Sequence, residues 1–238
     1  MLKNKTQVLD MWTGKITSKF TYNELPVEVH TWADSDSDTV AIAVDSPLLK
    51  TGSLALFFDF PYPTDNKFDA PFVGVFNKTS QHTTTLEAST GGASIRHDLG
   101  TTSYITSMNW SGQANISGPA LGTHRYSLTP QGSESIQLTV NFSPVGVTNS
   151  KPVATYGDIT TSSEKWWEDY WTSGAFVDMT AVKSVNATEL QRRTMLSLYL
   201  EAVNSASSLP PQGELLFISE KASWVHIANT CSRVRYVR

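Results

Sequence analysis

The chain has 238 residues, a formal net charge of −4 at neutral pH and a sequence pI near 5.7. That length can bury a sizeable core, either in one large domain or in two small ones. The acidic balance, with no basic cluster before Arg233 and Arg235, argues against a nucleic-acid partner, and no apolar run is long enough to predict a membrane span.

Signals of cellular location point in two directions. The opening residues, MLKNKTQVLDMW, lack the apolar core of a signal peptide, and the single Cys231 cannot form an internal disulfide. The N-glycosylation acceptor pattern nevertheless occurs at Asn4, Asn77, Asn109, Asn115, Asn141 and Asn186. These sequons favour an extracellular glycoprotein with a leader outside this sequence, and chance triplets in a Ser/Thr-rich chain are the alternative.

From Gln7 to about Phe142 the sequence predicts antiparallel β structure. Runs rich in Val, Ile, Thr and aromatic residues recur between turn residues. In chain order these runs are QVLDMW, KITSKFTY, LPVEVHTWA, TVAIAVDS, SLALFFDF, TTTLEAS, ASIRHDL, SYITSMNW, HRYSLT and SIQLTVNFS. Many short strands at regular spacing predict a β-sandwich rather than a parallel sheet.

Some of these runs carry finer predictions. The alternation in LPVEVHTWA predicts two strand faces, with Val27, Val29 and Thr31 on one and Glu28, His30 and Trp32 on the other. SLALFFDF is almost continuously apolar, which predicts a central strand. The pair Gly91-Gly92 predicts a hairpin, and the stretch from Pro61 to Gln81 predicts a long polar loop.

Beyond Pro144 the pattern changes from strands to helices. The stretch VGVTNSKPVATYGDITTS is typical of a linker. Ser162 or Ser163 is then expected to cap a short helix, EKWWEDYW, which Gly174 ends.

A longer helix is predicted from Asn186 up to the Pro210-Pro211 stop. Asn186 with Glu189 three residues later forms a capping-box-like start, which a glycan on Asn186 would disrupt. Its apolar residues leave almost no polar face: Met195, Leu196, Leu198, Tyr199, Leu200 and Val203. A helix of this kind is usually buried by neighbouring elements.

Three stretches carry a resemblance to one protein family. They are QVLDMWTGKITSKFTYNELPVEVHTWAD, WWEDYWTSGAFVDMT and ELQRRTMLSLYLEAVNSASSLPPQ. Together, from about Gln7 to Gln212, they resemble the six-hairpin glycosidases, in particular a fungal and bacterial branch of glycoside hydrolase-like proteins. That branch is related in architecture to the disaccharide phosphorylases and α-fucosidases. The most specific part is the terminal motif from Leu190 to Gln212.

The resemblance implies a mainly β fold. In such proteins an antiparallel β super-sandwich leads through linker helices into an (α/α)6 toroid, whose first helix ends in a Pro-Pro-Gln loop. The chain then divides into an incomplete β-sandwich domain over 1–145, a linker with a short helix over 146–185, the first toroid-like helix and its loop over 186–213, and a divergent tail over 214–238.

The resemblance assigns no catalytic residue to this sequence, because the catalytic acid of such enzymes lies further along the toroid. It implies substrate contacts by Gln212 and Glu214 in the Pro-Pro-Gln loop, and an exposed loop acid is the alternative for Glu214. The residues after Gln212 match the family's continuation poorly. This mismatch predicts a truncated product or gene model that lacks the catalytic centre.

Aromatic and acidic residues offer further candidates for chemistry. A sugar-stacking platform could be formed by Trp166, Trp167, Tyr170 and Trp171. The i, i+3, i+4 spacing of the last three favours a buried stripe instead.

The acidic residues Asp34, Asp36 and Asp38 are spaced as in a calcium loop. They lack the Gly and Glu that such a loop requires, which favours a solvated turn. Asp59, Asp98 and Asp178 are acid candidates by residue type only.

Metal and cofactor chemistry is not expected. The histidines His30, His82, His97, His124 and His226 are scattered without metal-ligand spacing, and there is neither a nucleophile motif nor a phosphate-binding glycine loop.

The preferred hypothesis is a fragment of a carbohydrate-active glycoside hydrolase-like protein that is inactive alone. A non-catalytic carbohydrate-binding or scaffold sandwich is the alternative, and a poorly folding remnant is a third reading. The sugar, its linkage, the choice between hydrolysis and phosphorolysis, and the oligomeric state stay open.

Overall fold

The computed structural model describes residues 2–63, 74–146 and 153–205. These residues belong to two compact units. The first unit comprises Met1–Asp10 and Gly14–Glu164, and the second comprises Met11–Thr13 and Lys165–Arg238. Within the described ranges, no helix combines the length and apolarity needed to cross a membrane.

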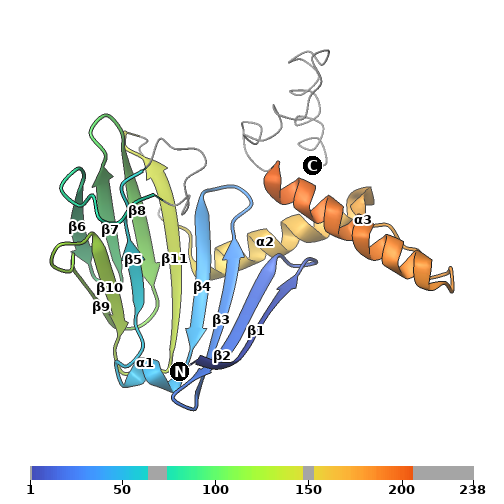
Figure 1. The fold of residues 1–238 in the computed structure, drawn as a ribbon, viewed down its shortest axis with the longest axis horizontal. Helices are drawn as coiled ribbons and strands as arrows, with labels where there is room; N and C mark the ends of the chain where they lie inside the picture. Colours follow the sequence, from blue (N-terminus) through green and yellow to red (C-terminus); the bar gives the residue numbers. More distant parts are fainter. Residues whose placement is uncertain (1, 64–73, 147–152, 206–238) are drawn as a thin grey trace. The chain divides into compact units, whose positions relative to one another are not determined.

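The first unit contains two antiparallel sheets (Figure 1). The larger has eight strands in the order β1-β2-β3-β4-β11-β8-β7-β6. They are β1 (Leu2–Asp10), β2 (Lys15–Tyr22), β3 (Leu25–Ala33), β4 (Thr39–Asp45), β6 (Thr83–Ser89), β7 (Gly92–Asp98), β8 (Ser103–Trp110) and β11 (Ser135–Pro144). The smaller sheet, in the order β5-β10-β9, consists of β5 (Leu56–Asp59), β10 (Arg125–Pro130) and β9 (Ala114–Ser117).

The two sheets share one apolar core, so the predicted mainly β, sandwich-like fold is confirmed. Tyr126 and Leu128 of β10 are fully buried in it, together with Ile95, Met108 and Leu138 of the larger sheet. In Figure 1 the smaller sheet lies in front of β11, β8, β7 and β6. Alternate residues enter the core because successive strand side chains point to opposite faces. Burial of each large apolar side chain stabilises the fold by roughly 1.5–3 kcal/mol.

Strand β3 has the two faces that its sequence predicts. Val27 is buried in the core between the sheets. Trp32, on the opposite face, packs in a separate cluster with Ala41 of β4 and Ile159 of helix α2 (Tyr156–Tyr170). The strand is therefore covered on both sides at different points along its length.

The prediction that SLALFFDF forms a central strand is wrong. Its β5 segment is an edge strand of the three-stranded sheet. Leu56 and Phe58 pack against the core, but Phe57 between them is 62 % exposed. The Arg125 guanidinium lies 4.7 Å from the centre of the Phe57 ring and covers part of it. A cation over an aromatic face allows an apolar residue to lie on the outer side of an edge strand.

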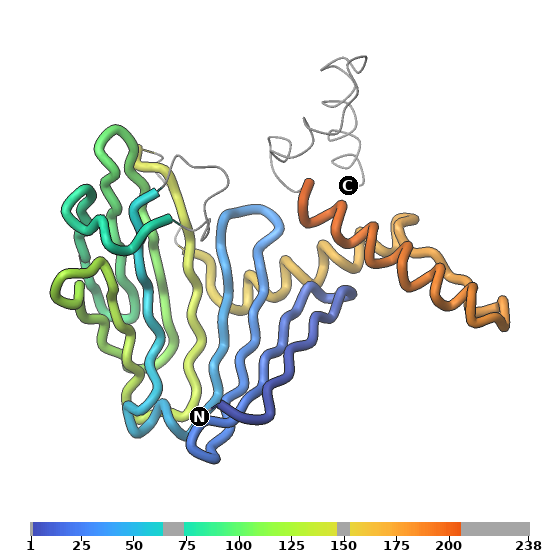
Figure 2. Tube along the Cα trace, viewed as in Figure 1, coloured from blue at the N-terminus to red at the C-terminus, as the bar shows by residue number. Residues whose placement is uncertain are grey.

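Two short elements were missed by the sequence prediction. Helix α1 (Pro47–Lys50) is capped by Ser46, whose hydroxyl accepts a hydrogen bond from the amide of Leu48. Figure 2 shows the chain leaving β4 through this helix and returning as β5. Strand β9 is the other missed element. Both are only four residues long, too short to produce a recognisable hydrophobic period.

The glycine hairpin is confirmed. Strands β6 and β7 pair antiparallel in register from Thr83 opposite Asp98 to Ser89 opposite Gly92. Gly91 has φ of 75°, a conformation that glycine adopts without steric penalty.

Helix α2 begins earlier than predicted, and neither Ser162 nor Ser163 is its cap. The Thr155 hydroxyl accepts from the Asp158 amide, and the Asp158 carboxylate accepts from the Thr155 amide. This reciprocal pair is a capping box, and it places residues 156–162 of the predicted linker in the helix. The helical path ends in the π-helical turn Trp171–Ala175. Gly174, with φ of 117°, leaves the helical conformation within this turn, as the sequence predicts.

Helix α3 spans Val185–Asn204, and the predicted Asn186 cap is wrong. The N-cap position is Ser184, without a side-chain cap bond, so Asn186 already lies inside the first turn. Glu189 does not reach back to the helix start, because its carboxylate binds the guanidinium groups of Arg192 and Arg193 one turn later. The expected competition between a cap and a glycan at Asn186 therefore does not arise.

Candidate functional site

Gln212 and Glu214, the two substrate-binding residues implied by the resemblance, lie outside the described residues. Their role stays a prediction. The described residues do contain the other candidates, and each is considered through its contacts.

The aromatic stripe of α2 forms the core of the second unit. Trp171 is 1 % exposed, and its indole Nε1 donates to the Met11 carbonyl at 2.7 Å. The Tyr170 hydroxyl donates to the Leu198 carbonyl of α3 at 3.0 Å. A buried indole or phenol normally finds such a partner, since an unpaired polar group would be costly there.

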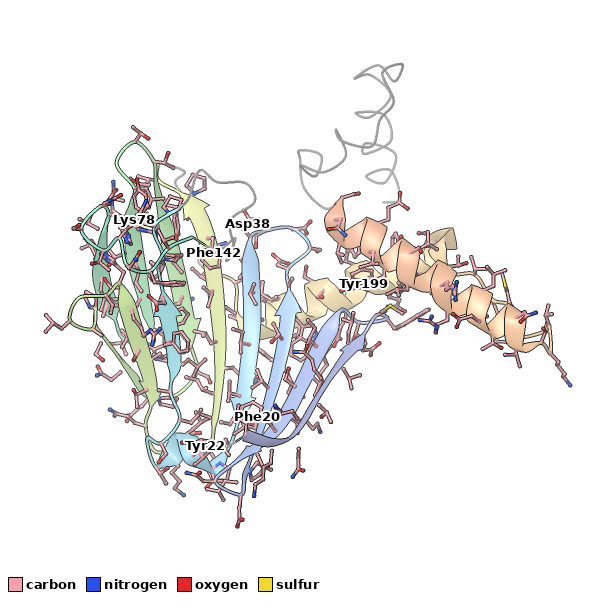
Figure 3. All side chains as sticks on the ribbon, viewed as in Figure 1. Phe20, Tyr22, Asp38, Lys78, Phe142 and Tyr199 are labelled. Carbon is pink, nitrogen blue, oxygen red and sulfur yellow. The ribbon has the colours of Figure 1, made fainter. Side chains whose placement is uncertain are left out.

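Stacking against α3 completes this core. The ring of Trp167 stacks on Tyr199, which Figure 3 labels on α3, with centroids 5.0 Å apart. Trp166 stacks nearly parallel on Tyr170 at 5.4 Å and keeps partial exposure. Trp167, Tyr170 and Trp171 thus form a packing stripe, as their spacing favoured, and not an open sugar platform.

Each acid proposed by residue type is engaged in a local contact. The contacts are Asp59 with Arg125, Asp98 with Arg96 and Ser103, and Asp178 with Thr180. Side-chain hydrogen bonds, from Arg96 and from Thr180 respectively, hold the pKa values of Asp98 and Asp178 below the ordinary range. A general acid needs a raised pKa, so neither carboxyl suits that role.

The Asp34–Asp38 loop is a hydrogen-bonded turn between β3 and β4, the arrangement that its sequence favoured. The Asp34 carboxylate accepts hydroxyl bonds from Ser37 at 2.6 Å and from Ser162 of α2 at 2.7 Å. The amide of Phe142 donates to the Asp38 carbonyl at 3.0 Å, and Figure 3 labels these two residues close together. Among the described residues, no group of His, Cys, Asp and Glu side chains is arranged to hold a metal ion.

Three of the histidines that are far apart in the sequence lie together in the structure. His82, just before β6, His97 of β7 and His124, just before β10, meet at one end of the sandwich. The rings of His82 and His124 are 3.9 Å apart between centroids, and those of His82 and His97 are 4.8 Å apart. His82 is 4 % exposed and His97 is 1 % exposed. We call these three side chains the histidine cluster.

The hydrogen-bond partners of His124 indicate which of its two ring nitrogens carries the hydrogen. Its Nε2 lies 2.9 Å from the Thr79 carbonyl, which can only accept, so Nε2 carries the hydrogen. In a neutral ring Nδ1 is then the acceptor for the Thr84 hydroxyl at 2.8 Å. Thr84 in turn accepts from the Tyr126 hydroxyl at 2.7 Å. The chain Tyr126 to Thr84 to His124 to Thr79 is therefore fully paired.

The other two histidines form a second hydrogen-bonded chain. His82 Nδ1 lies 2.7 Å from His97 Nε2, and His97 Nδ1 lies 2.9 Å from the Tyr104 hydroxyl. Either direction of donation satisfies both nitrogens of His97. His82 Nε2, however, is buried without a hydrogen-bond partner. An unpaired buried nitrogen of this kind typically costs about 1–3 kcal/mol.

Burial favours the neutral form of two of the three rings, His82 and His97. The pKa of His97 is lowered to about 4, chiefly by burial and then by repulsion from His82 and His124. The pKa of His82 is also lowered, by burial first and by His124 second. Both imidazoles are therefore uncharged near neutral pH.

The sequence contained one signal for this cluster. A hairpin turning at Gly91 pairs Thr84 with His97, which brings His82 within reach of His97. The arrival of His124 depends on β10, which belongs to the other sheet and leaves no local trace in the sequence.

Comparisons with known proteins bear on the fold. The sequence matches no family model and no curated protein sequence. Among solved structures, the fold is similar to a putative kojibiose phosphorylase from the human microbiome, with a TM-score of 0.52 and 9 % identity over 86 % of this chain and 29 % of that chain. A family GH92 alpha-mannosidase from Bacteroides thetaiotaomicron aligns over 86 % of this chain and 27 % of its own, at 10 % identity and a TM-score of 0.33.

The chain thus spans less than a third of the length of these solved structures. The resemblance drawn from the sequence is confirmed at the level of the fold: the described residues fold like a portion of a glycosidase-like protein.

Proposed function

We propose that this chain is part of a carbohydrate-active enzyme that cleaves glycosidic bonds by hydrolysis or phosphorolysis. The similarity of the fold to a putative kojibiose phosphorylase, over 86 % of this chain, carries the proposal. The motif from Leu190 to Gln212, which resembles the first toroid helix of six-hairpin glycosidases, supports it independently.

The catalytic centre is proposed to lie outside residues 2–205. Glycosidic bond cleavage needs a protonated carboxyl group beside the leaving oxygen. The pKa values of Asp98 and Asp178 are lowered, and Asp59 forms an ion pair with Arg125 at 2.7 Å. These contacts support a structural role for all three acids. The sandwich and α3 would then act as a scaffold for a site in the rest of the enzyme.

Two assays test this function. The purified chain is incubated with kojibiose, with and without inorganic phosphate, and sugar release is measured. We expect no release from this chain alone, and release from a version extended by the coding sequence that follows it. A measurable rate from the chain alone would show that its proposed inactivity is wrong. If the neighbouring coding sequence encoded no toroid, the proposal that the chain belongs to a larger carbohydrate-active enzyme would fail.

Gln212 and Glu214 are proposed to bind the sugar in that extended protein. Gln212→Ala and Glu214→Gln are each expected to lower kcat/KM by about tenfold or more, through KM, because a contact made in both ground and transition states is lost. Asp178→Asn, which changes an exposed acid in the second unit, is the matched control. If both loop variants kept the kinetics of the unmodified protein, Gln212 and Glu214 would not be sugar-binding residues.

A non-catalytic carbohydrate-binding role is the second candidate. Trp12 is 44 % exposed and packs edge-to-face with Phe176, itself 42 % exposed, at 5.8 Å. Exposed aromatic faces suit the apolar faces of sugar rings. Saturable oligosaccharide binding that is lost in Trp12→Ala but kept in Phe57→Ala, an exposed aromatic of the first unit, would favour this role over the enzyme.

A further inference from the structure

The histidine cluster ties two separate chain segments to the sandwich. One segment contains Phe60 and Tyr62, and the other runs from Gly74 to His82. Phe60 packs edge-to-face on His97 at 5.5 Å, and Tyr62 packs on His82 at 5.7 Å. The Thr79 carbonyl accepts from His124.

The two segments also bind each other. The amides of Tyr62 and Val75 donate to each other's carbonyls at 3.0 and 2.8 Å. A change in the cluster therefore acts on both segments together.

We propose that His82, His97 and His124 form an acid-sensitive latch. Near neutral pH the latch holds the segments around Tyr62 and Val75 against β7, β8 and β10, and acidification releases them. This inference does not depend on the proposed enzymatic function.

Near neutral pH the latch is closed because His82 and His97 are buried as neutral rings. The bond between His82 Nδ1 and His97 Nε2 needs a lone pair on one of the two nitrogens. One proton added to the His82–His97 pair preserves their bond but places a charge in a buried site. When both rings are protonated, His82 Nδ1 and His97 Nε2 each carry a hydrogen, so the bond between them is lost.

Few groups around the latch can compensate for added positive charge. Among residues 2–63, 74–146 and 153–205, the titratable and charged side chains around it are Tyr62, Lys78, Asp98, Tyr104 and Tyr126. Lys78 adds a positive charge near Tyr62, and the phenols are neutral. Asp98 is the one acid of this set, and it already binds Arg96 and Ser103. The ion pair of Arg125 with Asp59 belongs to residues on the outer side of the β10–β5 pair.

The direction of the pH effect follows from proton linkage. His97 has a pKa of about 4 in the closed state and the ordinary histidine value of 6.5 when released. The released state binds more protons between these two values, so closure is strongest above about pH 6.5 and is lost as the pH falls toward 4. For His97 alone, linkage at about pH 5 favours release by about thirtyfold relative to high pH.

Amide hydrogen exchange, corrected for intrinsic rates, measures release. The Tyr62 and Val75 amides report on the latch, and the Leu138 amide of β11 reports on the stable sheet. From about pH 7 to about pH 5 we expect the opening constants at Tyr62 and Val75 to rise about tenfold or more, with Leu138 much less affected. Flat opening constants at Tyr62 and Val75 over this range would overturn the latch.

Variants assign the effect to the cluster. In the double variant His82→Gln and His97→Gln the pH dependence of opening should fall below about twofold. His30→Gln, in which the replaced ring contacts Glu28 on β3, should keep the full dependence. If the double variant does not fold, imidazole NMR titration of the unmodified protein decides: ordinary pKa values near 6.5 for His82 and His97 would contradict the latch, and depressed values coupled to opening would support it.

Discussion

His82 and His97 lie fifteen positions apart in the sequence, yet their imidazoles share a 2.7 Å hydrogen bond inside the sandwich. The β6–β7 hairpin sets this distance, and the smaller sheet brings His124 to the same place. His82 and His97 are buried and their pKa values are lowered, and His82 packs on His124, so imidazole rings join the two sheets at a point within a largely apolar core.

The Tyr104 hydroxyl is expected to stabilise this pair. Tyr104→Phe removes the partner of His97 Nδ1, at 2.9 Å, and leaves a buried nitrogen unpaired. We expect the free energy of unfolding to fall by about 1–2 kcal/mol, measured by chemical denaturation. Tyr22→Phe, at an exposed position of β2, is the control and should change it by less than about 0.5 kcal/mol. Equal effects would show that the hydroxyl is not used.

Gly118 is expected to tolerate no side chain. A Cβ there would lie 2.8 Å from the Arg125 carbonyl oxygen and 2.9 Å from Tyr126 Cα, and φ is already 137°. Gly122 shares a positive φ but has no atom within 4 Å of the same position. Gly118→Ala should therefore destabilise the sandwich by at least about 2 kcal/mol more than Gly122→Ala. Thermal unfolding of the two variants, side by side, makes the comparison.

Trp171 is expected to be the most sensitive aromatic of the second unit. Trp171→Phe removes the Nε1 bond to Met11 and leaves a cavity at a position that is 1 % exposed. The expected loss of stability is about 2–4 kcal/mol, followed by near-UV circular dichroism during denaturation. Trp166→Phe, which changes a partly exposed ring, should lose clearly less. A larger loss in Trp166→Phe would contradict this packing.

Thr155 is expected to cap α2, whereas Asn186 does not cap α3. Thr155→Ala removes the hydroxyl that accepts from the Asp158 amide, which should lower stability by about 1 kcal/mol. Asn186→Ala should be nearly neutral, because the residue is exposed and lies past the Ser184 cap position. Denaturation midpoints of the two variants test the assignment, and the opposite order would restore the cap predicted from the sequence.

The ion pairs of Glu189 are expected to weaken in acid. Hydrogen bonds from Arg192 and then Arg193 lower the pKa of Glu189 to about 2, from its ordinary value of 4.5. A depressed carboxyl pKa stabilises the fold above about pH 4.5, and that contribution is lost as the pH falls toward 2. The pair is exposed, so the effect is screened by salt. Glu189→Gln should lower Tm slightly near neutral pH, and the difference should vanish near pH 2 or in about 1 M NaCl.

Most of the strands were predictable from the sequence, because their alternating faces and turn residues are local properties. The alternation of Val27 and Trp32 and the hairpin at Gly91 both follow from neighbours a few residues away. The buried stripe of Trp167, Tyr170 and Trp171 follows equally from helical spacing. The family resemblance found in the sequence also predicted the fold, which is similar to that of a putative kojibiose phosphorylase.

Which strands form an edge and which polar residues meet depends on contacts between distant segments. The β5 part of SLALFFDF lies at an edge, where Arg125 of the neighbouring strand covers part of the exposed Phe57 ring. The start of α2 depended on the Thr155–Asp158 hydrogen bonds, and the start of α3 on the extended backbone of Ser184, rather than on the neighbours that the sequence favoured. The histidine cluster forms only when the two sheets pack together. Burial then lowers the pKa of His97, and His97 shares a hydrogen bond with His82; no local sequence pattern predicts either property.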